Sequence, residues 1–122
     1  MTRALVWAAV GGLGGVGACA RVWLDVEVSR RLRWAFPLGT MAVNVSGAFV
    51  LGVLAGAGVA GDAELIAGTA VLGSFTTFST WMLESERLGQ LERARLAWCN
   101  VGVSLAAGLA AVALGRALGG LL

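Results

Sequence analysis

Uncharged hydrogen-bonding side chains gather at residues 73–80, which hold a glycine, a pair of threonines, two serines and a further threonine. This stretch lies inside an apolar segment at residues 65–84 whose length approaches that of a membrane crossing. Irregular polar backbone at membrane depth is tolerated only where protein buries it or where it lines a wet cavity. We therefore interpret residues 73–80 as a functional site. The alternative is an ordinary helix whose hydroxyls bond their own carbonyls.

Further neutral donors occur at helical spacing on both sides of this stretch. Thr40 and Asn44 are four residues apart, and so are Asn100 and Ser104, so that each pair shares one helix face. Such groups either join neighbouring helices or replace the hydration shell of a small anion. No carboxylate lies in the middle of an apolar segment, which argues against proton-coupled transport.

Two aromatic residues, Phe78 and Trp81, are three residues apart and share one face of the same segment. The edge of an aromatic ring is the positive end of its quadrupole, so two such edges could stabilise an anion in a narrow passage. On spacing alone, packing or anchoring at the membrane interface is the more common role of such a pair.

The composition places these groups in a membrane protein. Of the 122 residues, 58% are hydrophobic and the mean hydropathy is +0.84, whereas soluble domains average about 45–50% apolar residues. The apolar residues form four long segments, which predict an all-α integral membrane protein whose residues 1–122 make a single domain. The four helices are expected at about residues 4–20, 36–59, 65–84 and 96–118.

The chain offers little to an enzyme or to a zinc site. It contains no histidine, and Cys19 and Cys99 show no metal-ligand spacing. Because no nucleophile–base pair is visible, we expect no enzymatic activity. The glycines of residues 12–17 match a dinucleotide-binding pattern, but the acid expected about 20 residues later is missing.

The arginines are distributed unevenly between the two ends of the expected helices. Two of the nine lie on the side of the chain termini, and seven lie in the first and third connections. The positive-inside rule therefore predicts a multi-pass protein of the cell membrane with both termini outside.

Three motifs and the polar positions of the last helix together resemble the Fluc (CrcB-type) fluoride channel family. The motifs are a glycine-rich first helix that ends in Arg21, a second-helix pattern over residues 39–52 and the polar stretch at residues 73–80. The resemblance covers almost the whole chain and implies a passive, fluoride-selective channel that lowers cytoplasmic fluoride. It also implies four transmembrane helices per subunit, a broken third helix and an antiparallel dimer with pores along its interface.

The resemblance further implies roles for single residues. Backbone carbonyls of Gly73 and Thr76 would hold a structural sodium ion (Na+) at the dimer centre, because unwound carbonyls are hard oxygen ligands. Arg21 would lie in a vestibule and attract anions. Trp81 stands where the family has a second pore phenylalanine. The residues expected along the fluoride pathway are Asn44, Phe78, Trp81, Thr40, Thr77, Asn100 and Ser104.

Two other functions fit some of these features. A small multidrug-type, proton-coupled transporter has a similar size, but it needs a carboxylate in its first helix, and residues 4–20 contain none. A non-transporting membrane assembly subunit would explain the glycine-rich packing and leave Asn44 without a purpose. The expected partners are fluoride, the lipid bilayer and an antiparallel second subunit. The arginine bias leaves open whether that subunit is a second copy in a dual-topology homodimer or a related chain of opposite orientation.

Overall fold

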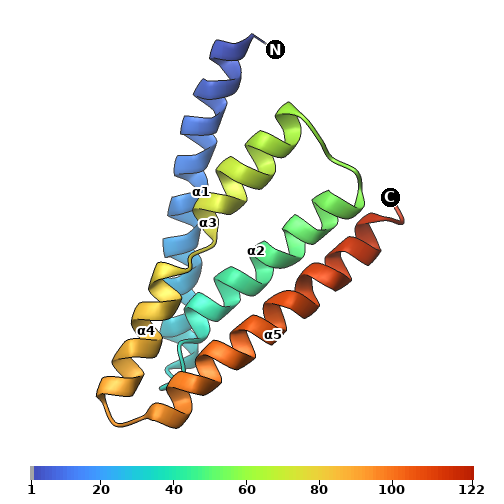
Figure 1. Cartoon of the computed structure of the whole chain (residues 1–122). Helices are drawn as coiled ribbons and strands as arrows, with labels where there is room; N and C mark the ends of the chain where they lie inside the picture. Colours follow the sequence, from blue (N-terminus) through green and yellow to red (C-terminus); the bar gives the residue numbers. More distant parts are fainter. Residues whose placement is uncertain (1) are drawn as a thin grey trace.

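The computed structural model describes residues 2–122, which fold as a set of helices with no strand in that range. In chain order the elements are α1 (Arg3–Leu32), α2 (Leu38–Gly56), η1 (Glu64–Leu72), α3 (Gly73–Phe75), α4 (Ser79–Gln90) and α5 (Ala94–Gly119). Figure 1 shows α2 and α5 side by side, with α1 crossing them at one end and leaning away at the other.

Three of these helices, α1, α2 and α5, are long and apolar enough to cross a membrane. The expected third helix at residues 65–84 is divided into η1, α3 and α4, none of which reaches bilayer length alone. The all-helical membrane class predicted from the apolar segments is therefore confirmed, and the polar stretch at residues 73–80 coincides with the interruption.

Helix α1 is longer than the apolar segment that predicted it, because it continues past residue 20 to Leu32. Glu27 accepts hydrogen bonds from Arg30 and Arg31, one helical turn further on. Such pairs stabilise an exposed helix turn by about 0.2–0.5 kcal/mol each. The helix ends where Arg33 adopts a left-handed conformation with φ of 41°.

Helices α2 and α5 pack in parallel through small residues. A Cβ on Gly115 would collide with the carbonyl oxygen of Phe49, and a Cβ on Gly119 would collide with that of Val53. Gly52 faces the backbone of α5 in the same way. Close backbone approach replaces the hydrophobic effect as the packing force between helices in lipid, so these glycines let α2 and α5 pack tightly.

Helix α1 meets η1 through a second glycine contact. A Cβ on Gly17 would collide with the carbonyl of Val71, and Gly14 lies against Ala70 and Ser74. η1 winds more widely than an α-helix, since the N–H of Gly73 reaches the carbonyl of Gly68 five residues back. The glycine-rich segment near the N-terminus therefore positions the element that leads into the interruption.

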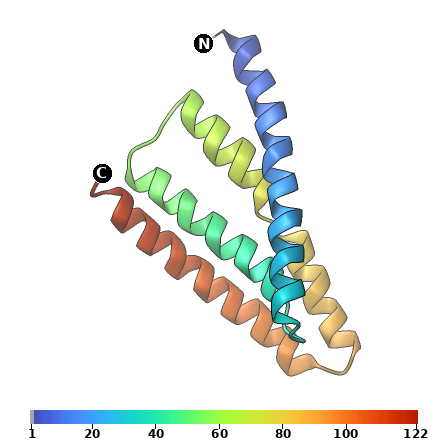
Figure 2. The same cartoon turned by 180° about the vertical axis from the view of Figure 1, so that it is seen from behind.

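The connections alternate between two ends of the molecule. Both termini and the connection between α2 and η1 lie at one end, and the α1–α2 and α4–α5 connections lie at the other, as Figures 1 and 2 show from opposite sides. Gly58 and Gly61 have φ of 68° and 67°, which suits glycine in the tight reversal after α2. η1 consequently runs back in the direction opposite to α2.

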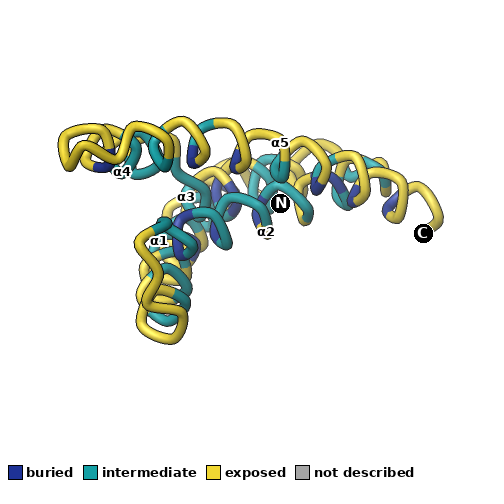
Figure 3. Tube along the Cα trace, turned by 90° about the horizontal axis from the view of Figure 1, so that it is seen from below, coloured by how far each residue is buried: buried dark blue, intermediate teal, exposed yellow. Residues whose placement is uncertain are grey.

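Few residues of this subunit are buried. Figure 3 shows that buried positions gather along α2 and the sides of its neighbours that face it, while exposed positions cover most of α1 and α5. In α1 only Val6 and Gly17 are buried. Large apolar side chains thus cover much of the outer surface, which is the arrangement expected in contact with lipid or another subunit.

Candidate functional site: a polar groove at the helix interruption

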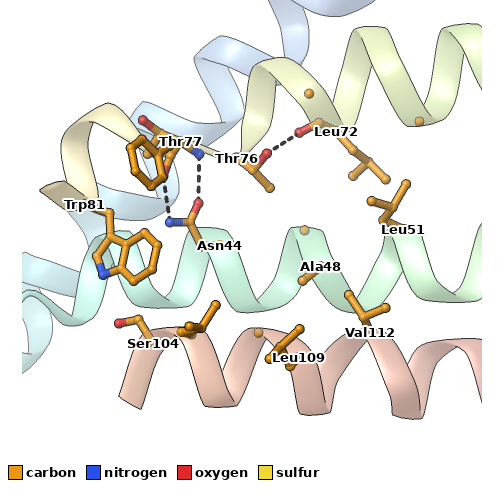
Figure 4. Close-up of a pocket in the computed structure, with 16 residues that line it drawn as sticks. Asn44, Ala48, Leu51, Leu72, Thr76, Thr77, Trp81, Ser104, Leu109 and Val112 are labelled. Atoms are coloured by element: carbon orange, nitrogen blue, oxygen red, sulfur yellow. Dashed lines mark hydrogen bonds between the residues drawn. The ribbon is translucent and has the colours of Figure 1, made fainter. Parts of the chain in front are cut away.

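The interruption between α3 and α4 opens onto a groove of about 400 Å³ that runs along α2, with η1 and the interruption on one side and α5 on the other. Thr76 is extended, with φ of −76° and ψ of 158°, and Phe78 returns to helical geometry. Figure 4 shows that the groove has a polar end at Asn44 and Thr77 and an apolar end among leucine and valine side chains.

Asn44 bridges α2 to the interrupted backbone. Its side-chain amide donates to the carbonyl of Thr77 and its side-chain oxygen accepts from the N–H of Thr77, both at 2.8 Å. Figure 4 marks both bonds. The pair of bonds replaces helical hydrogen bonds that the interruption removes, and it leaves one amide N–H of Asn44 free to meet a ligand.

The hydroxyl groups of the interruption bond mainly to their own neighbourhood. Thr76 Oγ1 donates to the carbonyl of Leu72 at 2.9 Å. Thr77 Oγ1 lies 3.2 Å from Thr80 Oγ1 and accepts the N–H of Thr80 at 3.3 Å. These short-range bonds hold the irregular backbone in one conformation. They are needed because the extended conformation of Thr76 breaks the helical hydrogen-bond pattern.

Two carbonyls of the interruption lose their usual helical donors. In a continuous helix the N–H of Thr77 would bond the carbonyl of Gly73, but it donates to Asn44. The N–H of Thr80 would bond the carbonyl of Thr76, but it donates to Thr77 Oγ1. Neutral carbonyl oxygens are suitable ligands for a hard monovalent cation, so the carbonyls of Gly73 and Thr76 fit sodium. No cluster of three histidine, cysteine or acidic side chains occurs in residues 2–122 to hold another metal.

Phe78 and Trp81 form the aromatic wall of the groove. Their ring centroids are 5.8 Å apart and the ring planes meet at 88°, an edge-to-face arrangement. Phe78 is 69% exposed, so its ring projects from the subunit. Trp81 is half-buried, and its indole N–H donates to the main-chain carbonyl of Asn100 at 3.0 Å.

Asn100 and Ser104 lie together on α5 but differ in access to the groove. Asn100 is 1% exposed, donates to Ser85 Oγ at 2.9 Å and accepts from Ser104 Oγ at 3.2 Å. Ser104 also lines the groove, whereas Asn100 does not. The pattern of Asn100 and Ser104 four residues apart therefore marks a contact between α4 and α5 as well as a groove wall.

Thr40 also lies outside the groove. It is 2% exposed, and its hydroxyl donates to Glu84 Oε1 at 2.9 Å, which ties α2 to α4. The other carboxylate oxygen of Glu84 is buried without a hydrogen-bond partner in the described part of the chain. The sequence analysis did not single out Glu84 and Ser85, because they lie at the end of the apolar segment. Their position three and four residues after Trp81 is the signal that places them near its helix face.

The structure therefore separates the residues that the sequence grouped. Arg21 lies on α1 in a different hollow, beside Trp23 and Glu27. Thr40 and Asn100 are enclosed in helix contacts. The expected site residues that line the groove are Asn44, Gly73, Thr76, Thr77, Phe78, Trp81 and Ser104.

Comparisons with known proteins match nearly the whole chain. A family model described as CrcB-like protein, Camphor Resistance (CrcB), matches residues 7–116. A fluoride-specific ion channel FluC 2 from Mycolicibacterium paratuberculosis is 48% identical over 118 residues, which cover 97% of each chain. Symbiobacterium thermophilum has two similar proteins. Its fluoride-specific ion channel FluC 1 is 39% identical (93% of this chain, 96% of the relative), and its FluC 2 is 43% identical (91% and 94%).

Proposed function

This chain belongs to the CrcB family, and from that membership we propose that it is a passive, fluoride-selective channel that lowers the cytoplasmic fluoride concentration. The observation that carries the proposal is the groove, where neutral donors and two aromatic rings meet at an interrupted helix. Conduction needs no chemical reaction, and we expect no catalysed one.

Neutral donors suit a small anion because they replace its water without fixing a charge. The free N–H of Asn44 would bind the ion first. The hydroxyls of Thr77 and Ser104 would follow after each rotates its O–H away from its present acceptor, Thr80 Oγ1 or Asn100 Oδ1. The edges of Phe78 and Trp81 would stabilise it between these sites. Since no lysine, arginine or carboxylate lines the groove, nothing there would hold or repel the ion strongly.

The chain is a multi-pass membrane protein, and we propose four crossings. The third crossing in chain order would be made by η1, α3 and α4 in succession, with the interruption at mid-membrane. Non-helical backbone at that depth must be enclosed by protein or line a wet cavity. The hydrogen bonds from Asn44 to Thr77 and the groove itself meet this requirement.

We propose that two such subunits pack antiparallel, with the groove of each facing the other. The exposed ring of Phe78 and the exposed leucines of α5 beside it support this, since they leave an apolar face beside the polar groups. The second subunit is either another copy or a related chain of opposite orientation. The two related channel proteins of Symbiobacterium thermophilum support the second form of the dimer.

At the centre of that dimer, the carbonyls of Gly73 and Thr76 from both subunits would bind a structural sodium ion. Both carbonyls lack their usual helical donors, which supports the assignment. The ion would supply a fixed positive charge that joins the two interruptions.

The decisive experiment is fluoride efflux from liposomes that contain this protein alone, followed with a fluoride electrode. We expect rapid efflux when a potassium ionophore balances the charge, and none from protein-free liposomes. Efflux with chloride in place of fluoride should stay at the protein-free level. Absence of fluoride efflux from the protein alone would show that this chain does not form a working channel without another subunit. Recovery of efflux on adding a related subunit would then establish the paired form.

A further inference from the structure

Trp81 has a hydrogen bond that phenylalanine, the residue implied at this position by the family resemblance, cannot make. Its indole Nε1–H donates to the main-chain carbonyl of Asn100 at 3.0 Å, which joins α4 to α5. The donor is therefore occupied inside the subunit. The aromatic ring of Trp81 still lines the groove.

The acceptor of this bond is rigidly placed. Asn100 is 1% exposed, and its side chain bonds both Ser85 and Ser104. Ser85 in turn donates to the carbonyl of Trp81 at 2.9 Å. Trp81, Asn100 and Ser85 form a closed ring of hydrogen bonds between α4 and α5, and Ser104 adds one more bond to Asn100. This network fixes the position of the indole.

Phe78 has little support of its own. The residue is 69% exposed, and its ring makes an edge-to-face contact with the ring of Trp81. An exposed aromatic side chain samples several rotamers unless a neighbour restrains it. The orientation of the Phe78 ring within a subunit therefore depends on the orientation of the indole.

We propose that Trp81 is a positioning residue, whose indole N–H is latched to the Asn100 carbonyl so that its ring sets the orientation of Phe78 in the groove. The inference rests on the proposed fluoride conduction. It also states that the indole N–H is not offered to the ion, so Trp81 contributes a ring and no donor to the pathway.

The test of the latch is Trp81→Phe. This substitution keeps an aromatic side chain, makes the ring system smaller and removes the N–H donor. A single hydrogen bond shifts a local equilibrium by roughly a factor of 2 to 12. We expect fluoride efflux per folded protein to fall by a factor in that range. Discrimination against chloride should fall as well, because the two rings no longer hold one arrangement. A purely structural role would change stability and leave the efflux of the folded fraction unchanged.

The matched control is Trp98→Phe. Trp98 is 76% exposed on α5 and lies outside the groove, so the same substitution there should leave efflux and discrimination unchanged. Equal losses in both variants would mean that any tryptophan replacement impairs the protein, and would overturn the proposal.

A measurement on the unmodified protein tests the latch without relying on the variant's folding or on conduction. The indole proton resonance assigned to Trp81 should exchange slowly with solvent, and adding sodium fluoride should not shift it. Rapid exchange, or a strong shift on adding fluoride, would overturn the latch. If the latch is present but the protein conducts no fluoride, the proposed function fails and the structural half of this inference stands. Wild-type efflux and discrimination in folded Trp81→Phe would overturn the positioning role alone.

Discussion

Asn44 illustrates how one polar side chain serves both the fold and the proposed pathway. Two of its hydrogen-bonding groups hold the backbone of Thr77, and one N–H remains for a ligand. A buried amide without partners would destabilise the protein by about 1–3 kcal/mol, so the helix interruption and the asparagine depend on each other.

The first prediction concerns Asn44→Asp. The carboxylate has no N–H for the Thr77 carbonyl, and it places a negative charge beside the path of an anion. We expect fluoride efflux to fall to the level of protein-free liposomes, and the free energy of unfolding to drop by about 1–3 kcal/mol. Efflux and thermal unfolding in detergent measure the two effects.

Ser46→Ala is the control for this variant. Ser46 lies on the same helix, but its hydroxyl bonds only the carbonyls of Ala42 and Val43 within that helix. Efflux and stability should both stay near the wild-type values. Normal efflux in Asn44→Asp would remove Asn44 from the pathway.

Among the helices, the glycine contact between α2 and α5 determines where the groove can form. It brings the two backbones together at Gly52, Gly115 and Gly119, and the groove opens beside it. The interruption after α3 then faces this pair, since Asn44 of α2 reaches it. A helix pair held less closely would not keep Ser104 and Asn44 on the same groove.

The second prediction concerns Gly115→Ala. The added methyl group would collide with the carbonyl of Phe49, and overpacking of this kind lowers stability by about 1–3 kcal/mol. We expect a lower unfolding midpoint in detergent, measured by the fraction that stays monodisperse on size exclusion after heating.

Gly102→Ala makes the same change on the same helix at an open position. Nothing lies within 4 Å of a Cβ built there. Alanine stabilises a helix by about 0.5–1 kcal/mol relative to glycine, so this variant should match or exceed the wild type. Equal destabilisation by both substitutions would contradict the assigned α2–α5 contact.

If two subunits pair as proposed, the main question is how they meet and face the membrane. In the proposed dimer, the second subunit would cover the groove and part of the exposed apolar surface, while the seven-to-two distribution of arginines favours one insertion direction. A homodimer of antiparallel subunits requires both directions from one sequence. The arginine bias therefore motivates the hypothesis that this chain has a fixed orientation and works with a partner of opposite bias.

The third prediction tests that orientation. Epitope tags at either terminus should be accessible from outside intact cells in nearly all molecules, since the arginine-rich connections stay in the cytoplasm. The comparison is with permeabilised cells, in which every tag is accessible. Equal labelling of both sides would discard the fixed orientation and leave a dual-topology homodimer.

The fourth prediction concerns sodium. If the carbonyls of Gly73 and Thr76 bind sodium in the dimer, replacing sodium with N-methylglucamine should lower the unfolding midpoint. A ligand at about 100 times its dissociation constant stabilises the folded state by about 2.7 kcal/mol. Replacing chloride with gluconate at constant sodium is the control and should have no effect. An unchanged midpoint without sodium would count against the ion.

The position of the helix interruption could be predicted from residues 73–80 alone, because polar backbone at membrane depth is a local property of the sequence. Apolar content did not reveal the length of α1, although Glu27, Arg30 and Arg31 stand at the three- and four-residue spacings that stabilise an exposed helix turn. The contact between Thr40 and Glu84 also could not be predicted from the sequence. It joins residues 44 positions apart, and only helix packing brings them together.

Hydropathy and helical spacing determined that this chain is a helical membrane protein with neutral polar groups at depth, because burial in lipid constrains each segment separately. Tertiary structure decided which donors remain available. The amide of Asn44 keeps one N–H, whereas the indole N–H of Trp81 is occupied by a bond to the carbonyl of Asn100, 19 residues away in sequence. A hydrogen bond between distant residues depends on how closely their backbones approach, and for Asn44 that approach is permitted by Gly47, which lies against Thr76 and Phe75.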